Sequence, residues 1–114
     1  MELRHHKTLT SQKWRTYSST QRILMVATEL NRAGHWIHKE DFAEVRLCYE
    51  RAMELMFLTV ETAGSPRQLR ELLRFVEVLN DSYMKETPDF VRNSALLKVL
   101  LLMDTGAWSA WQEP

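Results

Sequence analysis

Arg32 and His38 form the residue pair in this sequence that comes closest to a catalytic arrangement. An arginine can hold a phosphate through two hydrogen bonds, and a histidine can move a proton near neutral pH. Together the two side chains suit acid–base chemistry at a phosphate. The residues between them contain Gly34, so we expect the pair to span the loop that follows the first long helix.

Charged side chains also recur at helical spacing within segments that are otherwise apolar. Residues three apart share one face of a helix, as Glu29 and Arg32 would. If several such charges pointed inward, they would form an ion-pair network between helices or line a pocket for a polar ligand. The simpler interpretation places most of them at the rim of the core. The predicted network comprises Glu29, Arg32, Arg51, Glu54, Arg74 and Glu77.

Neither a metal centre nor a cofactor site is expected. His35 and His38 lie near Glu40 and Asp41 in the sequence and would hold zinc only weakly, and Cys48, the usual kind of ligand in a four-ligand structural zinc site, is a full helical stretch away. Cys48 is the only cysteine and lies in an apolar helical segment, where a thiol is usually a small buried residue. The three glycines are isolated, so the sequence has no glycine-rich phosphate loop.

Basic residues are concentrated near the N-terminus, although the formal net charge of the 114-residue chain is zero. We expect this basic arm to dock on the acidic remainder of its own chain. Arg67, Arg70 and Arg74 share one helical face, and with the arm they would suit a small nucleic-acid-binding module. Zero net charge argues against strong phosphate binding, so this function remains an alternative.

Four helices are expected to position these side chains, at about residues 18–33, 39–63, 66–84 and 88–105. Ser65–Pro66 and Thr87–Pro88 are typical helix starts. Short loops favour antiparallel neighbours, so the predicted fold is an all-α antiparallel four-helix bundle in one domain. A flexible basic arm, residues 1–13, precedes the bundle, and a tail with two tryptophans follows it.

The fourth predicted helix is apolar at eight of the nine positions 95–103. A small bundle cannot easily cover such a helix on every side, so either the tail or a second chain is expected to cover it. The preferred interpretation is a non-enzymatic protein that acts by self-association, as a homodimer, or by binding a protein partner. Its predicted interface anchors are Leu97, Leu101, Trp108 and Trp111.

The N-terminus lacks the apolar core of a signal peptide, and no apolar run approaches the ~20 residues that span a membrane. We therefore expect a cytoplasmic protein without membrane contact.

Two resemblances to known families are carried by these residues. The Arg32–His38 spacing resembles the motif of HEPN-type helical ribonucleases, which implies action on an RNA 2′-hydroxyl and its neighbouring phosphate. Over residues 14–81 the chain resembles a family of short, uncharacterised prokaryotic helical proteins, which implies a helical fold and no particular reaction. The matching residues are Trp14, Trp36 and the runs 29–33, 51–55, 58–60, 69–74 and 77–81.

Overall fold

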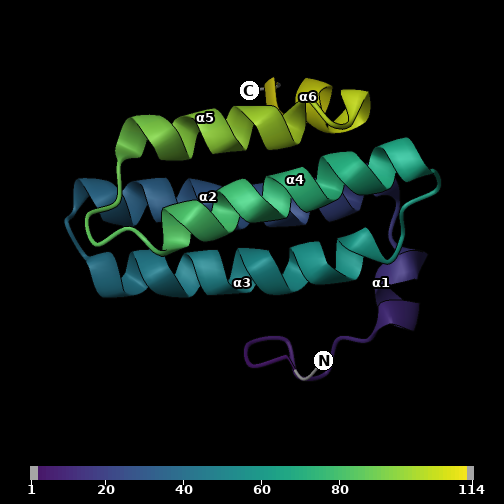
Figure 1. Cartoon of the computed structure of the whole chain (residues 1–114), viewed down its shortest axis with the longest axis horizontal. Coiled ribbons are helices and arrows are strands. Elements are labelled where there is room, and N and C mark those ends of the chain that lie inside the picture. The colour runs from purple at the N-terminus through teal and green to yellow at the C-terminus, as the bar shows by residue number, and fades with distance from the viewer. Residues whose placement is uncertain (1–2, 113–114) are drawn as a thin grey trace.

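The computed structural model describes residues 3–112, and within them every regular element is a helix (Figure 1). The all-α class predicted from the sequence is therefore confirmed. Six helices occur in this part of the chain where four were expected, because the arm and the tail each contribute a short one. Their bounds are α1 Ser11–Thr16, α2 Ser19–His38, α3 Phe42–Val60, α4 Pro66–Tyr83, α5 Phe90–Leu101 and α6 Thr105–Gln112.

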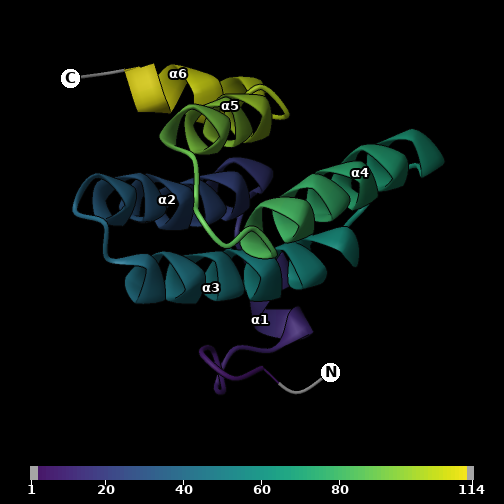
Figure 2. The same ribbon diagram turned by 60° about the vertical axis from the view of Figure 1, so that its left-hand side comes forward.

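Helix α2 lies at the centre of the fold, with α3 on one side and α5 and α6 on the other (Figure 2). Helix α4 packs mainly on α3 and is inclined to it, and its contact with α5 is small. The core therefore runs through the α3–α2–α5 layers. Helix α4 covers only one edge of this stack.

The helix starts follow local capping chemistry. The Ser65 hydroxyl accepts a hydrogen bond from the backbone N–H of Gln68, with Pro66 in the first turn, as the sequence predicts. Ser18 forms a reciprocal capping box with Gln21 at the start of α2. Asp89, rather than the expected Thr87, caps α5.

The predicted end of the first long helix at Gly34 is wrong, since α2 continues to His38. Gly34 is buried, and a Cβ there would lie 3.1 Å from Asn93 Nδ2 and 3.4 Å from a Phe90 ring carbon. This glycine therefore allows α5 to approach α2 closely, and it does not serve as a helix stop.

Asn93 on α5 joins three helices through its side-chain amide. Only 2% of the residue is exposed. Its Nδ2 donates to the carbonyl oxygen of Leu30 on α2 at 2.9 Å, and its Oδ1 accepts from the Tyr49 hydroxyl on α3 at 2.8 Å. Burial raises the pKa of Tyr49 to about 12, so the hydroxyl keeps its proton and remains a donor.

The N-terminal segment is held by the rest of the chain, contrary to the expected flexible arm over residues 1–13. Residues 1 and 2 lie outside the described part. Leu3 is buried, and α1 begins at Ser11. Trp14 is fully buried, and its Nε1 donates to Thr59 Oγ1 on α3 at 3.1 Å. The arm is thus docked on its own chain, as its charge suggested.

Replacing Asn93 with alanine is expected to destabilise the protein by about 2–3 kcal/mol, because the Tyr49 hydroxyl is left buried without its partner. Urea unfolding followed by circular dichroism measures the change. The matched control is Ser94→Ala, an exposed neighbour on α5, which should change the unfolding free energy little. Equal stabilities of the two variants would show that the amide does not hold the helices together.

Candidate functional site

A groove with mostly apolar walls lies between α4 and α5. Its volume is about 560 Å³. The buried side chains of Phe75 and Leu96 form its base, and more exposed residues form its walls. The full lining is Glu71, Arg74, Phe75, Val78, Arg92, Ala95, Leu96, Val99, Leu102 and Met103.

An exposed apolar ridge runs along α5 and forms much of the α5 wall of this groove. Val91, Ala95, Val99 and Leu102 are spaced by four, four and three residues, so they share one helical face. Val91, Val99 and Leu102 are 75%, 51% and 57% exposed. An uncovered apolar surface of this kind is typical of an interaction site. We refer to these four residues as the α5 ridge.

Charged side chains lie at both ends of the groove, and Glu71 at one end is paired with Arg67. Glu71 lies at the end near Met103, and these two residues also share a smaller pocket beside the start of α2. Arg92 lies at the other end, where its Nε donates to Ser82 Oγ at 2.8 Å. Arg74 lies on the α4 wall one turn from Glu71.

None of the predicted interface anchors lines this groove. Leu101 is 2% exposed and packs in the core, so its prediction as an accessible anchor is wrong. Leu97, Trp108 and Trp111 are partly buried against the core, and the tryptophans belong to α6, which packs on α2. The tail thus covers part of the apolar surface within one chain. The sequence carried no signal that identified the exposed face, because residues 95–103 are apolar on nearly every side of the helix.

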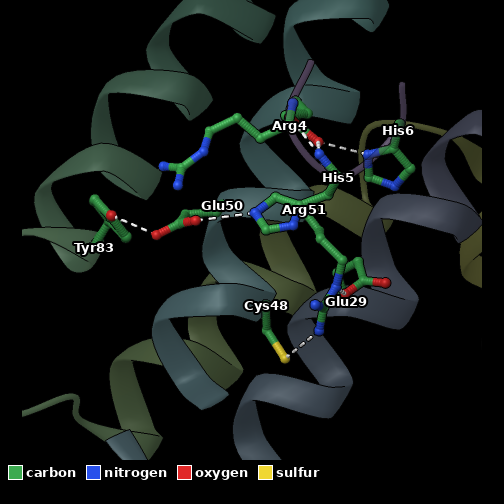
Figure 3. Close-up of polar contacts among 9 residues, drawn as sticks. Arg4, His5, His6, Glu29, Cys48, Glu50, Arg51 and Tyr83 are labelled. Carbon is green, nitrogen blue, oxygen red and sulfur yellow. Dashed lines mark hydrogen bonds and ion pairs between the residues drawn. The ribbon is translucent and has the colours of Figure 1, made fainter. Parts of the chain in front are cut away.

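Part of the predicted polar network exists. The Glu29 side chain is 8% exposed, and one of its oxygens pairs with Arg32 Nη1 at 2.9 Å. Its other oxygen pairs with Arg51 Nε, also at 2.9 Å (Figure 3). Arg51 also donates to Cys48 Sγ at 3.4 Å. Burial raises the pKa of the Cys48 thiol despite the nearby arginine, which argues against a reactive thiolate.

Glu54 belongs to a different cluster from the one predicted. Its carboxylate accepts hydrogen bonds from the backbone N–H groups of Arg4 and His5, and it lies 2.7 Å from His6 Nδ1. Glu50 lies 3.0 Å from His5 Nε2 and accepts from the Tyr83 hydroxyl at 2.8 Å (Figure 3). The arm is therefore held on α3 by two carboxylates. The sequence contains the arm histidines and the carboxylates of α3, but their spacing along the chain does not show which histidine meets which carboxylate.

The pKa values of both carboxyls are lowered by these contacts. Burial alone would raise the pKa of Glu54, but hydrogen bonds from His5, His6 and Arg4 together outweigh it. At Glu50 the hydrogen bond from His5 lowers the pKa most, and Tyr83 adds to it against the effect of burial. Both carboxylates therefore stabilise the docked arm when they are ionised.

The last two members of the predicted network do not join it. Arg74 and Glu77 are exposed on α4, and no ion pair joins them to another side chain within residues 3–112. Arg67 pairs with Glu71 at 3.7 Å, an exposed contact within one helix. The basic face of Arg67, Arg70 and Arg74 thus lies on a solvated helix surface.

Arg32 and His38 do not converge on a common point. Both lie within α2, and six residues place two side chains about 120° apart around a helix and ~9 Å along it. Arg32 pairs with Glu29, whereas the His38 ring stacks on Phe90 with centroids 4.1 Å apart. Their predicted position across a loop is wrong, and this arrangement does not favour joint action on one phosphate.

Between residues 3 and 112, no three side chains of His, Cys, Asp or Glu gather where they could hold a metal ion. None of the helices described is both long and apolar enough to cross a bilayer. Comparison with protein families, with characterised proteins and with solved structures found no match. The two family resemblances therefore stay predictions.

Replacing Arg51 with methionine is expected to cost about 3 kcal/mol of unfolding free energy, because it leaves the buried Glu29 carboxylate without its interhelical partner. Arg32→Met is the matched control. Arg32 is the more exposed partner of the same carboxylate, so its loss should cost under about 1 kcal/mol. Urea unfolding measures both, and similar costs would contradict this ranking.

The lowered carboxyl pKa values predict an acid-sensitive arm. The stabilisation is present above the unfolded pKa of about 4.3 and is lost as pH falls through the lower folded values. Glu54→Gln should therefore reduce stability by about 1–3 kcal/mol at pH 7, and its difference from the wild type should shrink near pH 3. Urea unfolding at both pH values measures this effect. Glu77→Gln, at an exposed site, should leave the pH dependence unchanged.

Proposed function

We propose that the protein acts by protein–protein association through the groove between α4 and α5, without a reaction of its own. The exposed α5 ridge beside the groove carries this proposal. An apolar groove flanked by a ridge and a few charges suits an amphipathic helix, whose apolar face would enter the groove. The charges at its ends would then set the orientation of the incoming helix.

The alternatives gain less support from the geometry. The HEPN-like ribonuclease would need Arg32 and His38 at one phosphate, and they are engaged with Glu29 and Phe90. The nucleic-acid-binding module would need the arm free, whereas His5 and His6 contact α3. The groove differs from these clusters because its polar side chains surround an apolar surface that nothing within residues 3–112 covers.

Thiol footprinting in living cells tests the proposal. The only native cysteine, Cys48, is fully buried, so Val99→Cys places one accessible thiol on the α5 ridge. We expect a membrane-permeant maleimide to label it about fivefold or more slowly in cells than in dilute purified protein, because a covered thiol reacts only when the complex opens.

The matched control is Ser94→Cys, an exposed position on α5 outside the groove lining. Its labelling rate should be similar in cells and in dilute purified protein. If Val99→Cys also reacts at equal rates under both conditions, the groove is not an association surface and the proposed function fails.

A further inference from the structure

We infer that the groove between α4 and α5 binds an amphipathic helix of a different protein, with Asp or Glu along the borders of the apolar face of that helix. This inference rests on the proposed association function and names the chemistry of its partner. Three of the ten residues that line the groove are charged, namely Glu71, Arg74 and Arg92. Two arginines against one glutamate make the lining positive, which favours a partner of the opposite sign.

The two arginines keep their positive charge, whereas the glutamate is partly neutralised. Glu71 Oε1 lies 3.7 Å from Arg67 Nε on the same helix. In the described part of the chain, no carboxylate forms an ion pair with Arg74 or Arg92. Arg92 Nε donates instead to the neutral hydroxyl of Ser82. A ligand in the groove thus meets two cations for which the described chain supplies no counterion.

The acidic residues nearest to the groove in sequence lie outside its lining. Asp89 is the N-cap of α5, where its carboxylate accepts a hydrogen bond from the backbone N–H of Val91 at 2.9 Å. Glu77 and Asp81 are exposed on α4, and neither lines the groove. Helix α5 itself contains no Asp or Glu. The α5 wall of the groove is therefore free of negative charge.

The two arginines lie on opposite walls, about two helical turns apart. Arg74 on α4 precedes Ser82 by eight residues, which is about 12 Å along that helix. Ser82 marks the position of Arg92, because its hydroxyl accepts from Arg92 Nε at 2.8 Å. An incoming helix covers the same distance in about two turns. Acidic side chains two turns apart, one on each border of its apolar face, would therefore meet both arginines.

The open walls of the groove favour a helix over a small molecule. Val99 and Leu102 are 51% and 57% exposed, so a compact ligand would leave much of the α5 ridge uncovered. A helix with its side chains is about 10–12 Å wide and can contact both walls at once. Its apolar face would cover the α5 ridge, and its polar borders would lie beside the arginines.

A second copy of this chain matches the same surface less well. Its α5 helix carries Arg92 and Lys98 and no acidic residue. Two such ridges packed together would bring cations next to cations, which costs affinity. An acidic helix from another protein brings opposite charges together along the same apolar contact.

Two dye-labelled synthetic peptides test the charge preference by fluorescence anisotropy with the full chain. Each peptide has about 18 residues, or five helical turns, with leucines repeated at i, i+3, i+4 and i+7. The positions that border the leucine face are Glu in one peptide and Lys in the other, and circular dichroism checks that their helicities match. At about 0.15 M salt the Glu peptide should bind ~30-fold more tightly than the Lys peptide. At about 1 M salt, where charges are screened beyond ~3 Å, the ratio should fall below about threefold.

Substitutions in the chain show whether the Glu peptide occupies the groove. Arg74→Glu should weaken its binding about tenfold, because like charges then face each other. The matched control is Arg70→Glu, an exposed position on α4 outside the groove lining, which should change the affinity by less than about threefold. Val99→Glu should weaken binding about 100-fold, because it places a carboxylate in the apolar contact. Leu73→Glu, at an exposed apolar residue outside the lining, should leave the affinity unchanged.

The outcomes separate this inference from the proposed function. Dissociation constants above about 1 mM for both peptides overturn a helix as the occupant, and an equal or reversed preference overturns an acidic one. A dimer in sedimentation equilibrium that Val99→Glu abolishes would assign the groove to a second copy and would also overturn the inference. In each of these cases, protection of Val99→Cys in cells keeps the proposed function. If that thiol is unprotected in cells, the proposed function fails and this inference fails with it.

Discussion

The buried Asn93 amide donates one hydrogen bond to Leu30 on α2 and accepts one from Tyr49 on α3, and the shape of the candidate site depends on this junction. Gly34 provides the space for it by omitting a Cβ where Asn93 and Phe90 approach α2. Helix α5 is therefore held on the central layer, while α4 packs mainly on α3. The groove arises because these two neighbours are anchored to different helices and meet only loosely.

In this fold some charged side chains are buried and some apolar side chains are exposed, which is the reverse of the usual arrangement. Glu29 and Glu54 are buried, but each is paired with cationic groups or backbone N–H donors, which offsets the cost of desolvation. Val99 and Leu102 are exposed, and nothing in the described chain covers them. The buried charges thus stabilise helix positions, whereas the exposed apolar residues remain available for binding. This contrast is why we place the function at the groove.

Much of the helical content could be predicted from the sequence, and the site could be predicted only in part. Ser65 and Pro66 marked a helix start because capping involves neighbours within one turn. Gly34 was wrongly predicted to end a helix, because the residues that require a glycine at this position lie on α5, far along the chain. The excess of apolar residues near position 100 was visible, but Leu101 and Leu102 face opposite environments, and only packing distinguishes them.

The sequence by itself determined the all-α class, most helix starts and the docking of a basic arm on an acidic body, because these follow from local periodicity, capping and the uneven distribution of charge along the chain. The tertiary structure decided which carboxylate each cation meets, so that Glu54 binds the arm while Glu29 binds Arg51. It also decided which face of α5 is exposed. Such choices depend on how helices distant in the chain pack together, and helical spacing within one segment does not contain that information.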